Sequence, residues 1–118
     1  MATVTKIPLS ASVNGAGVKV VATATPGTPG TLIHTATATT GQVDEIWLWA
    51  YNSDSANATL FIEWGSDTDL PRKVTIPLQS GLVPVIPGLL LQAGLTVRMY
   101  ASGANIIKVD GFVNRITF

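Results

Sequence analysis

Residues able to do acid–base chemistry are few and scattered in this chain. His34 is the single histidine, and its threonine-rich stretch offers no acidic residue at facing spacing. A Ser-His-Asp or Cys-His mechanism would have to use this residue, because the nucleophile needs a positioned base. The chain contains no cysteine, so thiol catalysis and zinc sites of the cysteine type are excluded. We therefore interpret His34 as a histidine that is either hydrogen-bonded within the fold or exposed at the surface, and not as a catalytic one.

The acidic residues are densest between Glu63 and Asp69. Asp67 and Asp69 could hold calcium through oxygen ligands, but the segment lacks the additional acids of strong calcium loops. A solvated acidic loop is the preferred interpretation, and calcium binding is left open. Glu45 and Glu63 could form the carboxylate pair of a glycoside hydrolase, although nothing in the sequence fixes their separation. The sequence therefore predicts no catalytic, cofactor-binding or metal-binding residue, and a protein that is not an enzyme.

The stretch QVDEIWLWAYN at residues 42–52 is apolar on both of its faces when it is placed on a β-strand. Alternate side chains of a strand point to opposite sides of its sheet. One side carries Ile46, Leu48 and Ala50, and the other carries Trp47, Trp49 and Tyr51. A strand with one solvated face should alternate apolar and polar residues. The aromatic side of this strand therefore needs a cover of its own.

Three kinds of contact could cover the aromatic side of the strand. Pyranose rings could stack on Trp47 and Trp49, a segment of the same chain could lie over them, or a partner subunit could bury them. A sugar site usually adds many Asn, Asp and Arg donors, and this strand has few. Tryptophan and tyrosine are enriched in the buried centres of interfaces. We favour an interface and assign to it Trp47, Trp49, Tyr51, Phe61, Phe112, Lys6, Ile7 and Leu9.

The overall composition narrows the partner classes. Seven basic and seven acidic side chains give a net charge of zero, so the basic patch that nucleic-acid binding requires is not available. Only 12% of the residues are charged, about half the usual share, which favours a surface that is partly covered in an assembly. The first 17 residues do not resemble a secretory signal, and no apolar run approaches the length of a membrane helix.

Short β-branched segments separated by Gly, Pro and Asx turns predict eight or nine strands, and no segment has a sustained helical period. This pattern is typical of an all-β sandwich or barrel. Residues 1–17 are predicted to form an extended N-terminal arm and residues 18–118 the sandwich domain. Residues 45–51 and 58–64 are expected to pair as a hairpin, which would place Phe61 and Glu63 beside the aromatic stripe. The predicted core contains Ile46, Leu48, Leu60, Ile62, Val97, Val109 and Val113.

Five sequence segments together resemble small proteins encoded beside the head genes of tailed bacteriophages, similar in type to capsid decoration or cement proteins. The segments are HTA at 34–36, DEIWLWAYN at 44–52, LFIEWG at 60–65, IPLQSGLVPVIPGLLL at 76–91 and VDGFVNRIT at 109–117. The resemblance covers residues 18 to 117. Its motifs are structural rather than catalytic.

The resemblance implies a jelly-roll-like antiparallel sandwich, commonly a homotrimer, on the outer surface of a capsid built from a major capsid protein. The protein would be made in the host cytoplasm and reside in the virion. The arm would reach a neighbouring subunit or the coat, so deletion of residues 1–13 is expected to weaken assembly and leave the sandwich folded. A phage tail or head-fibre module and a carbohydrate-binding sandwich are the alternatives.

Overall fold

The computed structural model describes residues 2–23, 30–67 and 70–118, and over these ranges the chain forms nine β-strands. No helix long and apolar enough to cross a membrane occurs in the same ranges. The strands are β1 (Thr3–Pro8), β2 (Val18–Lys19), β3 (Thr31–Thr35), β4 (Gln42–Asn52), β5 (Ala58–Trp64), β6 (Arg72–Ile76), β7 (Val83–Leu91), β8 (Thr96–Ala101) and β9 (Ile107–Thr117). The all-β prediction is confirmed.

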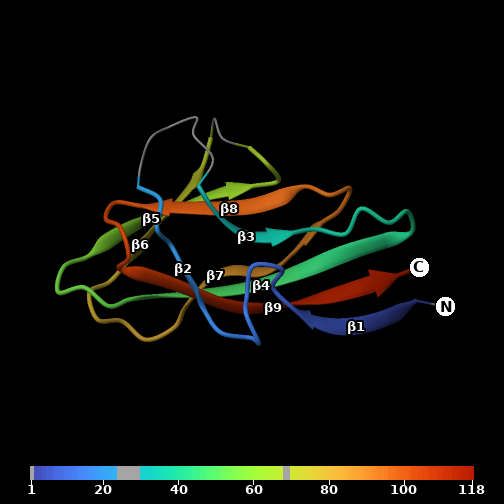
Figure 1. Ribbon diagram of the computed structural model, residues 1–118, viewed down its shortest axis with the longest axis horizontal. Helices are drawn as coiled ribbons and strands as arrows, with labels where there is room; N and C mark the ends of the chain where they lie inside the picture. Colours follow the sequence, from blue (N-terminus) through green and yellow to red (C-terminus); the bar gives the residue numbers. More distant parts are fainter. Residues whose placement is uncertain (1, 24–29, 68–69) are drawn as a thin grey trace.

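The strands form two antiparallel sheets that pack face to face (Figure 1). The larger sheet has the order β1-β9-β4-β7, with the short β2 also paired to β9. The smaller sheet has the order β3-β8-β5-β6. β4 and β9 pair over eleven residues, from Gln42 opposite Thr117 to Asn52 opposite Ile107, and they form the centre of the larger sheet.

The space between the sheets is filled by aliphatic side chains, as the alternating pattern predicts. All seven residues expected in the core belong to one buried cluster. Within β4 the inward side chains are completely or almost completely buried, whereas the outward aromatic ones are only partly buried. Burial of side chains of this size stabilises the fold by about 1.5–3 kcal/mol each. The alternation within β4 therefore fixes which side of the larger sheet faces the core.

The expected hairpin of residues 45–51 and 58–64 is wrong. β4 pairs with β7 and β9, whereas β5 pairs with β6 and β8 in the other sheet. The connection between them crosses from one sheet to the other, and Asn52 fixes its geometry: its amide donates to the carbonyls of Ala56 and Ile76. A short polar turn is compatible with a hairpin or with a change of sheet, so local sequence does not separate these outcomes.

Two prolines do not interrupt β7, which runs from Val83 to Leu91. Pro87 lies opposite Trp47 and Pro84 lies opposite Trp49, and the register with β4 shifts beside each of these pairs. Such irregularities let an edge strand tolerate residues that cannot donate a ladder hydrogen bond. β7 is an edge strand of the larger sheet, where proline also blocks unwanted pairing.

Within the N-terminal segment, β1 is an extended strand that docks on the larger sheet of the same chain, and turns follow it over residues 10–15. β1 pairs with β9 from Thr3 opposite Thr117 to Pro8 opposite Phe112. Leu9, expected in an interface, is 2% exposed and belongs to the core cluster, and Ile7 packs against that cluster. Deletion of residues 1–13 would therefore open the core, contrary to the expectation that the sandwich would stay intact.

Candidate functional site

The outer side of the larger sheet carries a group of stacked aromatic rings. Directly opposed residues of paired strands share a face, and Trp47 lies opposite Phe112. The ring centroids of Trp47 and Trp49 are 6.5 Å apart, and the Phe112 centroid is 6.3 Å from Trp47 and 6.0 Å from Trp49. The interplanar angles are between 14° and 29°, so the rings are nearly parallel. We call Trp47, Trp49, Tyr51 and Phe112 the aromatic face.

The ring of Trp47 is fixed by its neighbours. Gly88 of β7 has φ +81°, and a Cβ at this position would lie 2.7 Å from the Trp47 ring. The indole Nε1 donates to Glu45 Oε1 at 2.7 Å, and Asn114 Nδ2 donates to the same oxygen at 3.0 Å. Together the bonds from Asn114 and Trp47 lower the pKa of Glu45 below its usual value. The aromatic face is therefore preorganised, which reduces the conformational entropy that a partner must remove on binding.

The other predicted interface residues divide between this face and the rest of the molecule. Lys6 of β1 places its Nζ 4.6 Å from the centroid of Phe112, so the chain covers part of the aromatic face itself. Phe61 lies in the smaller sheet and stacks on Tyr100 at 4.6 Å, away from the tryptophans. Its assignment to the same stripe depended on the hairpin that does not form.

His34 and Asp44 are buried members of a polar cluster between the sheets. The Nε2 of His34 lies 2.8 Å from Asp44 Oδ2, and its Nδ1 accepts a bond from the backbone N–H of Ser10 at 3.0 Å. Arg115 donates to both oxygens of Asp44, at 2.8 and 3.0 Å, and the backbone N–H of Thr37 adds a bond at 3.1 Å. We call His34, Asp44, Arg115, Ser10 and Thr37 the polar cluster.

Asp44 is the acid that sequence reasoning missed. It lies in the same strand as the tryptophans, on the inward side, and the topology rather than the spacing brings it to His34. Burial by itself would raise the pKa of Asp44, but hydrogen bonds from Arg115, His34 and Thr37 and the charge of Arg115 leave it lowered. Its carboxylate correspondingly raises the pKa of Arg115. The sequence does contain a signal for this contact. Asp44 falls on the inward side of an otherwise apolar strand, and a buried acid needs hydrogen-bond partners.

The geometry of the polar cluster is that of a hydrogen-bond network that links the two sheets, and not that of a catalytic centre. His34 and Asp44 are 1% and 0% exposed, so no substrate reaches them. The imidazole atom that a general base would use, Nδ1, already accepts the Ser10 N–H. The Ser10 hydroxyl accepts from the N–H of Thr35 at 2.7 Å. The cluster joins β3 of the smaller sheet to β4 and β9 of the larger one.

The other carboxylates do not assemble into a site over the described ranges. Glu45 lies beside the aromatic face, where it accepts from Trp47 and Asn114. Glu63 is 1% exposed in the smaller sheet and accepts the backbone N–H of Gly30 at 2.6 Å. Asp67 is exposed and its Oδ1 accepts from the N–H of Leu70, and Asp69 lies outside the described residues. No group of at least three His, Cys, Asp or Glu side chains with the geometry of a metal site occurs among the described residues.

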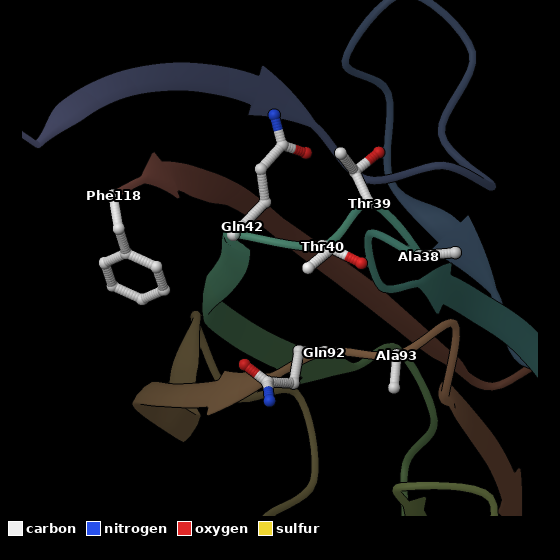
Figure 2. A pocket seen from close by; sticks show the side chains of 8 residues that line it. Ala38, Thr39, Thr40, Gln42, Gln92, Ala93 and Phe118 are labelled. Atoms are coloured by element: carbon white, nitrogen blue, oxygen red, sulfur yellow. The ribbon is translucent and has the colours of Figure 1, made fainter.

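A second apolar surface lies at the end of the sandwich where both termini are seen (Figure 1). A hollow of about 440 Å³ is lined by Val43, Leu90, Leu91, Gln92, Ala93, Leu95 and Phe118. A neighbouring hollow of about 400 Å³ shares Gln92, Ala93 and Phe118 and adds residues 38–42, with Phe118 on one side and Ala38 on the other (Figure 2). No charged side chain lines either hollow. We call this surface the Phe118 end.

Comparison of the chain with protein-family models, with curated proteins and with solved structures finds no match. The functional argument therefore depends on the geometry of the described residues.

Proposed function

We propose that this chain is a non-enzymatic virion protein that binds the outer surface of an assembled bacteriophage capsid and stabilises it. The observation that carries the proposal is the aromatic face, a preorganised and partly exposed platform of parallel rings on one side of a sandwich. Aromatic side chains of this kind dominate the energetics of protein interfaces. The resemblance to decoration proteins supplies the kind of partner, and the low charge content is compatible with it.

A jelly-roll-like fold is part of the proposal, and nested strand pairing supports it. β1 pairs with β9, β3 with β8, β4 with β7 and β5 with β6, all antiparallel. Pairs nested in this way correspond to one long hairpin wrapped into two sheets, the arrangement that a double Greek key of eight strands produces. β2 is then an addition to the edge of β9.

The extended arm expected over residues 1–17 belongs to the same proposal. β1 is an edge strand, and every residue of it except Ile7 is exposed. An exposed edge strand offers unpaired backbone groups to a neighbouring chain. In this proposal β1 keeps its own pairing with β9 and presents its free edge to a coat subunit.

Binding of this kind stabilises a shell by mass action. A protein that binds only the assembled shell lowers the free energy of that state by RT ln(1 + [L]/Kd) per site. The many equivalent sites of a shell make a modest affinity sufficient, and an oligomer that bridges several coat subunits adds avidity. No chemical step is required of the chain.

Cosedimentation with empty shells of the phage that encodes the chain tests the proposal. Wild-type protein should sediment with the shells and delay their disruption by heat or low ionic strength. Trp49→Ala should weaken this binding at least tenfold, since truncation of a central aromatic residue costs about 2 kcal/mol or more. Phe61→Ala is the matched control, because Phe61 is a partly buried, stacked aromatic residue of the other sheet. Equal survival of bare and decorated shells would refute the stabilising role.

Two alternative functions predict different outcomes of the same experiments. A tail or head-fibre module would be found in the phage particle only at the tail or on fibres. A carbohydrate-binding sandwich is favoured by the parallel rings of Trp47 and Trp49, which lie beside the polar groups of Glu45 and Asn114. It would bind oligosaccharide with a change in tryptophan fluorescence that Trp49→Ala abolishes. These polar groups already bond one another, which leaves few free partners for sugar hydroxyls.

A further inference from the structure

A third hollow, of about 190 Å³, adjoins the aromatic face where β2, β4 and β9 lie side by side. Lys19 and Lys108 line it together with Tyr51, Ser53 and Asn105. The side chains of all five can donate hydrogen bonds, and the two lysines add positive charge. A depression lined by charge of one sign attracts and concentrates ions of the opposite sign. The residues of this hollow therefore suit an anion, and we call it the lysine hollow.

The strand register brings the two lysines to one side of the larger sheet. Lys19 of β2 lies directly opposite Lys108 of β9, and Lys108 lies opposite Tyr51 of β4. Directly opposed residues of paired strands share a face. Tyr51 belongs to the aromatic face, so the two lysines continue that surface beyond its last ring. A molecule that lies along the rings can therefore reach both ammonium groups.

The two lysines have no acidic partner within the described part of the chain, where neither forms an ion pair. Asp110 follows Lys108 on the same side of β9, but it does not line the hollow. Its carboxylate lies against Gly17, where a Cβ would be 2.6 Å from Asp110 Oδ1. Like charges placed directly opposite each other destabilise a sheet. A bound anion would offset this repulsion.

Backbone hydrogen bonds fix the walls of the lysine hollow relative to one another. The N–H of Ser53 donates to the carbonyl of Ile106 at 2.9 Å, which joins the end of β4 to the segment before β9. The N–H of Asn105 donates to the carbonyl of Val20 at 3.1 Å, and the N–H of Val20 donates to the carbonyl of Ile107 at 2.9 Å. These backbone donors are thus occupied, so an anion would be held by side chains, the two ammonium groups above all.

We propose that the lysine hollow binds a carboxylate of the partner that covers the aromatic face, with Lys19 and Lys108 as its ligands. An acidic side chain of a protein is the source that fits, because aromatic anchors with complementary charge beside them are features of protein interfaces. Glu45 and Asn114 beside the rings already bond each other, which leaves few partners for sugar hydroxyls. The charge contact would fix the direction in which the partner lies along the rings. That the partner is a protein rests on the proposed function.

Titration of the full chain with glutarate, followed by the backbone amide signals in NMR spectra, tests this site. Glutarate is the probe because it carries the carboxylate of a glutamate side chain. At constant ionic strength, saturable shifts should be confined to residues 18–20, 51–53 and 105–108. Lys108→Gln should weaken the binding about tenfold or more, because hydrogen bonds between charged groups are the strong ones. Lys73→Gln is the matched control: it removes the same charge from the other sheet, where Lys73 Nζ lies 5.7 Å from the centroid of Phe61, and it should leave the binding unchanged.

Three results would overturn the proposed site. The first is glutarate shifts that do not saturate or that spread over the whole surface. The second is binding that persists unchanged in both Lys19→Gln and Lys108→Gln. The third comes from glucuronate, which carries a carboxylate on a pyranose ring. If glucuronate binds far more tightly than glutarate and Trp49→Ala abolishes this advantage, the site belongs to an acidic sugar and not to a protein partner.

Cosedimentation with shells separates this site from the proposed function. If glutarate binds as expected but the wild-type chain does not sediment with shells, the carboxylate site stands and the capsid function fails. If Lys108→Gln binds shells as tightly as the wild type, the capsid function stands and the proposed contact fails. Weaker binding of shells by Lys108→Gln, with Lys73→Gln unchanged, would support both.

Discussion

β4 carries two opposite kinds of surface on its two sides. On the inward side, Asp44 lies in the interior and bonds His34, Arg115 and Thr37. On the outward side, Trp47 and Trp49 stack on each other and remain partly exposed. The usual distribution is reversed at both places, since an acid is buried and large aromatic rings face outward.

The two sides differ in how completely the rest of the chain bonds or covers their side chains. Both carboxylate oxygens of Asp44 have partners, and a buried charge with full hydrogen bonding indicates a structural role. The aromatic rings have one another, Gly88 and Lys6 as neighbours, and part of their area stays uncovered. Unused apolar area, rather than buried polarity, is therefore the better guide to binding in this molecule.

Removal of the buried carboxylate should have the largest effect. Asp44→Ala leaves His34 and Arg115 without their shared acceptor, and it should lower the free energy of unfolding by about 3–5 kcal/mol. Denaturation by urea measures this value. A loss below that of Trp49→Ala, which is expected at about 1–2 kcal/mol because its ring is partly exposed, would break the distinction between the two sides.

Leu48 lies between the two tryptophans in the chain and points into the core, where it is 1% exposed. Leu48→Ala should lower the free energy of unfolding by about 2–5 kcal/mol, from lost transfer energy and the cavity that remains. The exposed Leu82→Ala control should change it by no more than about 0.5 kcal/mol. Similar losses at both positions would show that the assignment of the inward face of β4 is wrong.

Gly88→Ala should disturb the outward side selectively. Gly88 has φ +81°, and the added methyl group would collide with the Trp47 ring, whereas Gly41 has φ +86° and open space around it. Both substitutions carry the cost of a left-handed conformation, about 1–2 kcal/mol. Only Gly88→Ala should in addition displace Trp47 and change the tryptophan fluorescence. Identical effects of the two variants would mean that the ring does not depend on Gly88.

Low pH should reduce the free energy of unfolding through Asp44 on the inward side, and this is the smallest of the expected effects. The pKa of Asp44 is lowered in the folded chain, so its ionised form favours folding above about pH 4, the usual value for an unfolded aspartate. This contribution is lost as the pH falls through the lower pKa of the folded state. Asp44→Asn should therefore lose less stability than the wild type as the pH falls below about 5. Urea midpoints at several pH values test this, and parallel slopes would contradict it.

The all-β character of the chain and the positions of β4 and β5 follow from local sequence. Residues 42–52 and 58–64 were predicted with the bounds that the structure shows for β4 and β5, because alternation and β-branched residues act locally. The same alternation identified the core side chains Ile46, Leu48 and Val113 correctly. The two-residue period of a β-strand also placed Trp47 and Trp49 on the outward side.

The pairing of the strands and the contacts between distant side chains, in contrast, do not follow from local sequence. Strand pairing depends on contacts between residues far apart in the chain. The alternation of side chains within one strand is the same whichever strand lies beside it, so it does not identify the neighbour. For this reason Phe61 was placed beside the tryptophans, Leu9 was expected in an interface, and Asp44 was not connected with His34. The Phe118 end likewise combines the turn before β4, the β7–β8 turn and residues after β9, and no single stretch of sequence carries its pattern.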